Sequence, residues 1–140
     1  MMMAGGWKSR ALVGFLAVVL CVLAITRLEG YRAGIERVPV LAGQTPGTLY
    51  TRPDADGPLV VVAHGFAGSR QLMEAFSLTL ARAGYAALAF DFEGHGRNPA
   101  PMGGDVDALD GTTALLVAVT RRVIDAGIAA TGRDGPVALI

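Results

Sequence analysis

Three apolar runs in the second half of the chain predict buried β-strands. Residues 59–63 (LVVVA), 86–90 (AALAF) and 137–140 (VALI) contain no polar side chain. A strand with one face in water alternates apolar and polar positions, whereas a parallel strand covered on both faces is apolar throughout. The first two runs begin at residues 59 and 86, a separation typical of a strand, helix and strand unit.

A helix is expected between these two runs, over residues 69–83. Ser69 is placed to cap its N-terminus, and Gly84 is placed to end it. The apolar positions fall on one face, which is expected to pack on the sheet: Leu72, Phe76 and Leu80. The polar positions fall on another face: Arg70, Glu74 and Ser77.

The remaining pattern predicts a β-hairpin before these strands and a second helix after them. Residues 37–41 and 48–52 are expected to be short strands around a turn formed by Gly43 and residues 46–47. Between residues 93 and 110 the apolar periodicity is lost, and the accumulation of Gly and Pro indicates a long loop. A second helical face then continues to residue 127; its apolar positions are Leu116, Val119 and Val123.

The N-terminal part of the chain contains a candidate membrane segment. Residues 11–26 carry no charge and are bounded by Arg10 and Arg27. As a helix they extend about 24 Å, and flanking arginines can snorkel to anchor a segment shorter than a core of about 30 Å. We interpret residues 1–30 as a single-pass membrane anchor, residues 31–36 as a linker and residues 31–140 as one soluble domain.

Two alternatives to a membrane anchor stay open, a cleaved signal peptide and a buried helix. The signal peptide is disfavoured because residues 24–26 (AIT) are a poor cleavage site. Basic residues flank the segment on both sides, with Lys8 and Arg10 before it and Arg27, Arg32 and Arg37 after it. With the amino terminus, the first group favours an extracytoplasmic soluble domain, while the second group favours the reverse orientation nearly as strongly. Both orientations stay open, and the extracytoplasmic one is slightly favoured.

Composition excludes several function classes. The 140 residues include 12 basic and 12 acidic side chains, so the formal net charge is zero, which provides no field for binding nucleic acid. Cys21 is the single cysteine, which excludes a disulfide framework. His64 and His95 are the two histidines, and with Cys21 in the apolar segment they form no ligand cluster. No metal and no organic cofactor are predicted.

Two glycine-containing motifs follow two of the predicted strands. Residues 64–69 (HGFAGS) follow the first run, and residues 91–98 (DFEGHGRN) follow the second, which Gly84-Tyr85 precedes. In this order the motifs resemble the α/β hydrolase superfamily, and most closely its branch of serine aminopeptidases and monoacylglycerol lipases, from residue 59 onward. The resemblance implies an α/β fold with a mostly parallel sheet and helices on both faces, in which residues 59–63 lie between the other two strands.

The resemblance also implies where catalytic residues lie. In the family, the strand corresponding to residues 137–140 leads into the G-x-S-x-G elbow that presents the nucleophilic serine, and the acid and the histidine follow. All three triad residues are thus absent from this chain, which resembles an incomplete domain and is expected to be inactive. By the resemblance, the chain supplies the backbone N–H of Phe66 as one oxyanion donor, Gly65 to leave room beside it, and His64 to support the loop.

Three further residues of the motifs could be mistaken for catalytic groups. Ser69 has no base near it in the sequence and stands where a helix favours a cap. Asp91 and His95 could form a catalytic pair, but the glycines that flank His95 favour a turn that shapes the rim of a pocket. We therefore assign none of the three a catalytic role.

The sequence predicts the N-terminal fragment of a membrane-anchored serine hydrolase that acts on an ester, thioester or amide through an acyl-enzyme. Two other classes stay open. Gly65, Gly68 and Asp91 match part of a dinucleotide-binding layout, but Arg70 stands where the third glycine is required. A membrane-tethered binding module without chemistry would explain the missing elbow if the chain were complete.

Overall fold

The computed structural model describes residues 5–103, 108 and 110–140, and the chain divides into two compact units. The first unit ends at Ala33 and contains helix α1 (Gly5–Arg32); the second begins at Gly34. The linker expected over residues 31–36 is therefore too long, because α1 continues to Arg32. The helix ends only where Gly34 adopts a left-handed φ of +75°.

Helix α1 is long and apolar enough to cross a membrane. The candidate span is Trp7–Arg32, with a mean hydropathy of 2.5, and none of it is buried. A helix of this length rises about 39 Å, more than a hydrocarbon core of about 30 Å, so the segment is longer than its uncharged stretch alone suggests. An N-terminal signal sequence can meet the same criteria of length and hydropathy.

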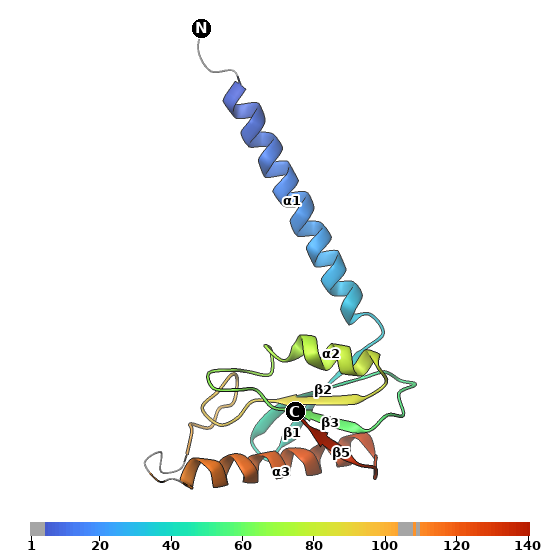
Figure 1. The fold of residues 1–140 in the computed structure, drawn as a ribbon, viewed down its shortest axis with the longest axis vertical. Helices are drawn as coiled ribbons and strands as arrows, with labels where there is room; N and C mark the ends of the chain where they lie inside the picture. The colour runs from blue at the N-terminus through green and yellow to red at the C-terminus, as the bar shows by residue number, and fades with distance from the viewer. Residues whose placement is uncertain (1–4, 104–107, 109) are drawn as a thin grey trace. The chain divides into compact units, whose positions relative to one another are not determined.

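The second unit is built on a five-stranded mixed sheet with the order β1-β2-β4-β3-β5 (Figure 1). Its strands are β1 (Glu36–Ala42), β2 (Thr45–Thr51), β3 (Leu59–Val62), β4 (Ala86–Phe90) and β5 (Val137–Leu139). Strand β3 pairs in parallel with β4 on one side and with β5 on the other. This confirms the expected order of the three apolar strands. The expectation that residues 137–140 are buried is wrong, because β5 is an edge strand and Leu139 and Ile140 are 55% and 57% exposed. Strands β1 and β2 are antiparallel additions beside β4.

The hairpin between β1 and β2 is tighter than the sequence pattern predicts. Ala42 pairs with Thr45, so the turn consists of residues 43–44, and Gly43 has a φ of +65°. A two-residue hairpin turn with a glycine in its first central position matches the twist of the strands that it joins. Pro46 and Gly47, which were expected in the turn, instead belong to β2.

One helix covers each face of the sheet (Figure 1). Helix α2 (Glu74–Arg82) joins β3 to β4, and helix α3 (Gly111–Thr131) precedes β5. The buried side chains of β3 alternate between the two faces: Leu59 and Val61 belong to the cluster with Val119 and Val123 of α3, whereas Val60 and Val62 belong to the cluster with Leu78 and Ala81 of α2. Because both faces are covered, the strand is apolar throughout.

Helix α2 begins later than expected. Residues 70–73 form turns, in which the N–H groups of Leu72, Met73 and Glu74 donate to carbonyl oxygens three residues earlier. Met73 occupies the N-cap position and no side chain caps the helix, so the assignment of Ser69 as N-cap is wrong. At the other end Gly84 adopts a φ of +92° and the N–H of Tyr85 donates to Leu80 O, which confirms Gly84 as the terminator.

The face that α2 presents to the sheet also differs from the prediction. Its buried residues are Ser77, Leu78 and Ala81. Leu80 is half-buried and packs against the core on this face of the sheet, as expected, and it also lines an open groove. Phe76 is 61% exposed and lines the same groove, while Leu72 lies outside the helix. The physical reason is that small side chains let a helix approach a sheet closely. The hydroxyl of Ser77 remains satisfied when buried, because it donates to Met73 O at 3.0 Å.

Helix α3 extends past Gly127, where the sequence pattern ends it. It terminates at Gly132, which has a φ of +64° and donates its N–H to Ile128 O. Gly127 lies in the helix interior, where a Cβ would come within 2.7 Å of Leu59 Cδ2 and 2.9 Å of Leu88 Cδ2. The glycine at 127 therefore permits close contact between helix and sheet.

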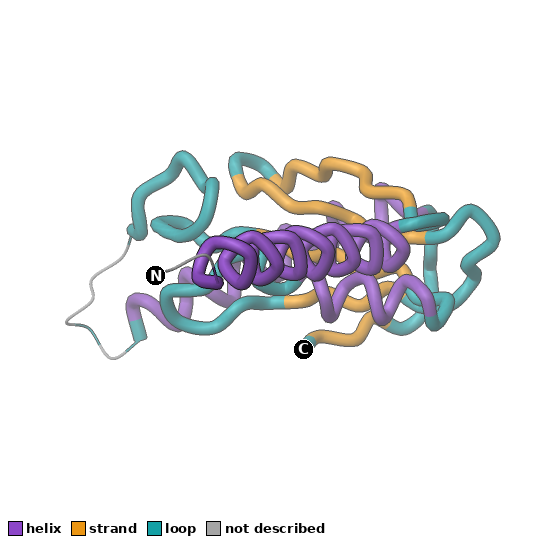
Figure 2. Tube along the Cα trace, turned by 90° about the horizontal axis from the view of Figure 1, so that it is seen from above, coloured by secondary structure: helices purple, strands orange, loops and turns teal. Residues whose placement is uncertain are grey.

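Two loops follow the carboxyl ends of the central parallel strands. The β3 loop, residues 63–73, follows β3, and the β4 loop, residues 91–103, follows β4. Figure 2 shows the C-terminal residue at the end of a strand, β5, which is an edge strand of the sheet. The central part of the long loop expected over residues 93–110 lies outside the described residues at positions 104–107 and 109.

Candidate active site

The β3 loop presents an exposed backbone turn at the carboxyl edge of the sheet. Gly68 N–H donates to Gly65 O at 3.0 Å, which closes a turn around Phe66 and Ala67. Phe66 is 99% exposed, and its N–H donates to no acceptor within the described part of the chain. Ala67 has a φ of +55°, the only positive φ of a non-glycine residue among those described. This conformation is unfavourable for a side chain with a Cβ.

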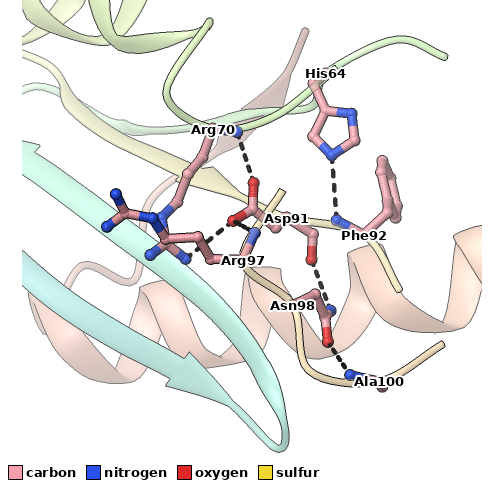
Figure 3. A network of polar contacts seen from close by, with 7 residues as sticks. All are labelled: His64, Arg70, Asp91, Phe92, Arg97, Asn98 and Ala100. Atoms are coloured by element: carbon pink, nitrogen blue, oxygen red, sulfur yellow. Dashed lines mark hydrogen bonds and ion pairs between the residues drawn. The ribbon is translucent and has the colours of Figure 1, made fainter. Parts of the chain in front are cut away.

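His64 is buried at the base of this turn and bonds both loops. Its Nε2 accepts the backbone N–H of Phe92 at 3.2 Å, and its Nδ1 lies 2.9 Å from Gly65 O (Figure 3). An Nε2 that accepts a hydrogen bond leaves the proton of a neutral imidazole on Nδ1, from where it can donate to the carbonyl. Both ring nitrogens are thus occupied by backbone groups.

The glycines of the β3 loop differ in what surrounds them. A Cβ at Gly68 would lie 2.8 Å from Gly65 O and 2.9 Å from His64 Cβ, so only glycine fits there without a shift. A Cβ at Gly65 would meet nothing within 4 Å. Within this chain Gly65 is therefore not required by packing, and the space beside it is open.

Asp91 is a fully buried carboxylate at the start of the β4 loop. Its Oδ1 accepts the backbone N–H of Arg70 at 2.7 Å, and its Oδ2 accepts that of Arg97 at 3.0 Å. The guanidinium of Arg70 lies 3.3 Å from the same Oδ2 (Figure 3). These contacts satisfy a charge that would otherwise be costly to bury.

The β4 loop is closed by its own hydrogen bonds. Asn98 Nδ2 donates to Asp91 O at 2.8 Å, and Asn98 Oδ1 accepts the N–H of Ala100 at 3.0 Å. The N–H of Gly94 donates to Ala100 O at 2.8 Å. Such a closed loop can hold its residues in fixed positions.

His95 lies beside the β3 loop rather than beside Asp91. Its ring centroid is 5.2 Å from that of His64 and 6.5 Å from that of Phe66, and its Nδ1 lies 3.0 Å from Glu93 O. The Asp91 carboxylate is directed to Arg70 and Arg97 instead. The structure thus gives no support to a catalytic pair of Asp91 and His95.

The described residues contain no group of three or more His, Cys, Asp or Glu side chains that could hold a metal ion. Among the described residues, the two loops bring together the unpaired backbone N–H of Phe66 and the imidazole rings of His64 and His95. An arrangement of this kind can stabilise negative charge on an oxygen, but the described residues of the two loops contain no nucleophile that is hydrogen-bonded to a base.

The pairing of Asp91 with Arg70 is not predicted by the sequence pattern. One signal was available, because an acidic residue directly after the fully apolar strand 86–90 is expected to be buried and to need a partner. The partner could not be read from the sequence, since Arg70 is separated from Asp91 by a helix and a strand.

Comparisons with known proteins agree with this architecture. The family model of the serine aminopeptidases of family S33 matches residues 55–127, which is just over half of the chain. No curated protein sequence matched.

Several solved structures are similar to the chain. TT1662 from Thermus thermophilus is 24% identical with a TM-score of 0.53, over 75% of this chain and 44% of that one. A putative lipase from Acinetobacter baumannii is 22% identical with a TM-score of 0.51, over 81% and 36%. An epoxide hydrolase from an endophytic Streptomyces is 28% identical with a TM-score of 0.50, over 76% and 30%.

The chain thus spans less than half the length of each of these structures. The matched region includes β3, α2, β4 and most of α3, the elements that position both loops. On this match and this sheet order, the chain belongs to the serine aminopeptidase S33 family and has the α/β hydrolase fold.

Proposed function

We propose that this chain is the N-terminal part of a membrane-anchored serine hydrolase that cleaves an ester, thioester or amide through an acyl-enzyme. Its β3 loop would supply one half of the oxyanion hole, through the backbone N–H of Phe66. The observation that carries this proposal is that N–H, which is unpaired within the described residues and lies in an exposed turn. Binding sites in open α/β sheets lie outside the carboxyl ends of the strands, where this turn is found.

The proposed chemistry follows from the place of the loop. Strand β3 lies directly beside β5, and in the family the nucleophilic serine follows the strand corresponding to β5. When a serine oxygen attacks a carbonyl carbon, the carbonyl oxygen becomes negatively charged. Preorganised N–H donors stabilise this charge, and losing one such donor lowers turnover by roughly 10²- to 10³-fold.

Gly65 and His64 would have supporting roles in this proposal. The open space beside Gly65 would let the carbonyl group of a substrate approach the backbone. The bonds from His64 to Gly65 O and from Phe92 N–H to His64 would hold the turn in place. With both ring nitrogens in use, His64 is not available for proton transfer.

The hydrolase proposal is favoured over a dinucleotide-binding site. In that layout an acidic side chain at the end of the second strand binds the ribose hydroxyl of the nucleotide. Asp91 is fully buried and already accepts two backbone N–H groups. Its carboxylate is therefore unavailable to a ribose.

We also propose that α1 is an uncleaved membrane anchor and that the soluble unit lies on the extracytoplasmic side. The length and hydropathy of the Trp7–Arg32 span support an anchor. The poor cleavage site after the apolar segment argues against removal as a signal sequence.

The test requires a chain extended past Ile140 through the rest of its reading frame, because no G-x-S-x-G motif lies within residues 1–140. The proposal predicts that this motif follows Ile140 and that a fluorophosphonate probe labels its serine. The 140-residue chain itself is expected to remain unlabelled. Absence of the motif, or labelling of Ser69, would overturn the proposal.

The role of the Phe66 N–H can be tested separately in the extended chain. Phe66→Pro removes the N–H, whereas the control Phe66→Ala removes only the exposed side chain. Turnover of the proline variant should be roughly 10² to 10³ times lower than that of the alanine variant, if one oxyanion donor is lost. Equal turnover in two folded variants would show that the donor lies elsewhere.

A further inference from the structure

The β3 loop is bonded to the β4 loop on both sides of its exposed turn. At one end, His64 accepts the N–H of Phe92. At the other end, the N–H of Arg70 donates to Asp91. Phe66, between these two ends, is 99% exposed. The two anchors on the β4 loop are consecutive residues, so the β3 loop is fastened to a short, closed segment.

We propose that Asp91 is a positioning residue of the active site, which holds the β3 loop so that the Phe66 N–H faces the reacting carbonyl. This inference rests on the proposed hydrolase function. Asp91 does not touch the substrate in this proposal. It acts through the Arg70 backbone, four residues after the donor.

The surroundings of Asp91 support a fixed geometry. The carboxylate is fully buried, and each of its oxygens accepts one backbone N–H, from Arg70 at 2.7 Å and from Arg97 at 3.0 Å. Its own N–H donates to Pro46 O at 3.0 Å, which also ties it to strand β2. Charge-assisted bonds to a buried acceptor are stronger than bonds between neutral groups.

Two glycines provide the space that these anchors need. A Cβ at Gly96 would lie 2.3 Å from Asp91 Oδ1, and Gly96 also has a φ of +54°. A Cβ at Gly68 would lie 2.9 Å from His64 Cβ. Glycine therefore stands at positions 68 and 96 because a larger side chain would collide with His64 or Asp91, the two residues that join the loops.

A conservative substitution separates positioning from folding. Asp91→Asn keeps the size of the side chain but replaces one acceptor oxygen by an NH₂ donor, which then faces an N–H donor. The matched control is Asp54→Asn, an exposed carboxylate whose pKa is lowered by its hydrogen bonds from Arg52. Asp54 lies in the turn before β3, at the amino end of that strand and away from both loops.

The first measurement uses the 140-residue chain in detergent micelles. An amide proton that donates to a carboxylate at short distance resonates far downfield in a nitrogen–proton NMR spectrum. Asp91→Asn should move the Arg70 amide upfield, and Asp54→Asn should leave it in place. An unchanged Arg70 signal in Asp91→Asn would overturn the assignment of this contact, whether or not the chain is a hydrolase.

The second measurement uses the extended chain, with turnover normalised to the number of fluorophosphonate-labelled sites. Asp91→Asn should lower kcat at least about tenfold with KM within about threefold, because the lost interaction acts in the transition state. Asp54→Asn should change neither constant. If Asp91→Asn lowers only the number of labelled sites, and kcat per site stays within twofold, Asp91 serves folding alone and the proposal fails.

Gly96→Ala gives a second variant that leaves the charge of Asp91 unchanged. Its Cβ displaces the carboxylate, so kcat should fall as in Asp91→Asn, and the double variant should lose less than the product of the two single losses. Independent effects would overturn the proposed coupling. If the extended wild-type chain takes no label, the hydrolase proposal is refuted, and the positioning role of Asp91 fails with it. The Arg70 amide signal does not depend on the hydrolase proposal and still tests the contact with Asp91.

Discussion

At the scale of single residues, the β3 loop contains a strained position beside the proposed oxyanion donor. Ala67 has a φ of +55°, which costs an L-residue roughly 1–2 kcal/mol. Glycine would adopt this conformation without strain. The adjacent Gly68 is a different case, because a Cβ there would lie 2.8 Å from Gly65 O. Strained backbone of this kind occurs often at functional sites.

Replacing Ala67 by glycine is therefore expected to stabilise the chain. The free energy of unfolding should rise by about 0.5–1 kcal/mol, because relief of the left-handed strain exceeds the entropy added to the unfolded chain. The control Ala75→Gly, on the exposed side of α2, should lower it by about 1 kcal/mol. Pulse proteolysis in urea measures both, and equal losses in the two variants would contradict the strain argument.

At the scale of elements, the structure changes which face of α2 is buried. Leu78 is 5% exposed and packs with Val60 and Val62 of β3, whereas Phe76 is 61% exposed. The sequence pattern placed Phe76 on the sheet because it assumed a helix that begins at Ser69. Leu72 lies in the turns over residues 70–73 rather than in the helix, and the residues of α2 that are buried are Ser77, Leu78 and Ala81.

Two alanine substitutions in α2 distinguish these faces. Leu78→Ala should lower the free energy of unfolding by about 2–5 kcal/mol, since it leaves a cavity in the core. Phe76→Ala should change it by less than about 1 kcal/mol, because most of that ring remains in solvent. Urea unfolding of the full chain in micelles provides the comparison. A larger loss of unfolding free energy for Phe76→Ala than for Leu78→Ala would show that the face predicted from the sequence is the buried one.

At the scale of the whole molecule, the chain combines an apolar helix with a separate compact unit. Contacts divide the two between Ala33 and Gly34. Helix α1 has no buried residue in its candidate span, whereas strands β3 and β4 are buried throughout. An exposed apolar helix of this length is unfavourable in water, which is the physical basis for the proposed membrane anchor.

An uncleaved anchor predicts how the protein fractionates. After carbonate extraction the chain should remain in the membrane pellet at full mass, and deletion of residues 1–30 should release it to the soluble fraction. Gel mobility and N-terminal sequencing provide the measurement. A soluble species that begins near Arg27 would identify the segment as a cleaved signal peptide instead.

The sequence by itself determined the class and order of most elements. Apolar runs at 59–63 and 86–90 specify strands covered on both faces, because few other structures bury every side chain of a short segment. The run at 137–140 also forms a strand, but its burial was not determined by the sequence, since β5 lies at the edge of the sheet. The uncharged stretch at 11–26 lies within α1, and Gly84 ends α2 as expected, since glycine readily adopts the left-handed conformation there. The two glycine motifs were sufficient to suggest the family.

Only the tertiary structure decided the start and the buried face of α2, the two-residue hairpin turn, the length of α3 and the partners of Asp91. Asp91 bonds to an N–H group 21 residues earlier in the chain, and His64 accepts one 28 residues later. Position 127 lies inside a helix and yet requires glycine, because a Cβ there would lie 2.7 Å from Leu59 on β3 and 2.9 Å from Leu88 on β4. Local patterns report the preferences of neighbouring residues, whereas these features depend on groups that meet only after the strands pair and the helices pack on them.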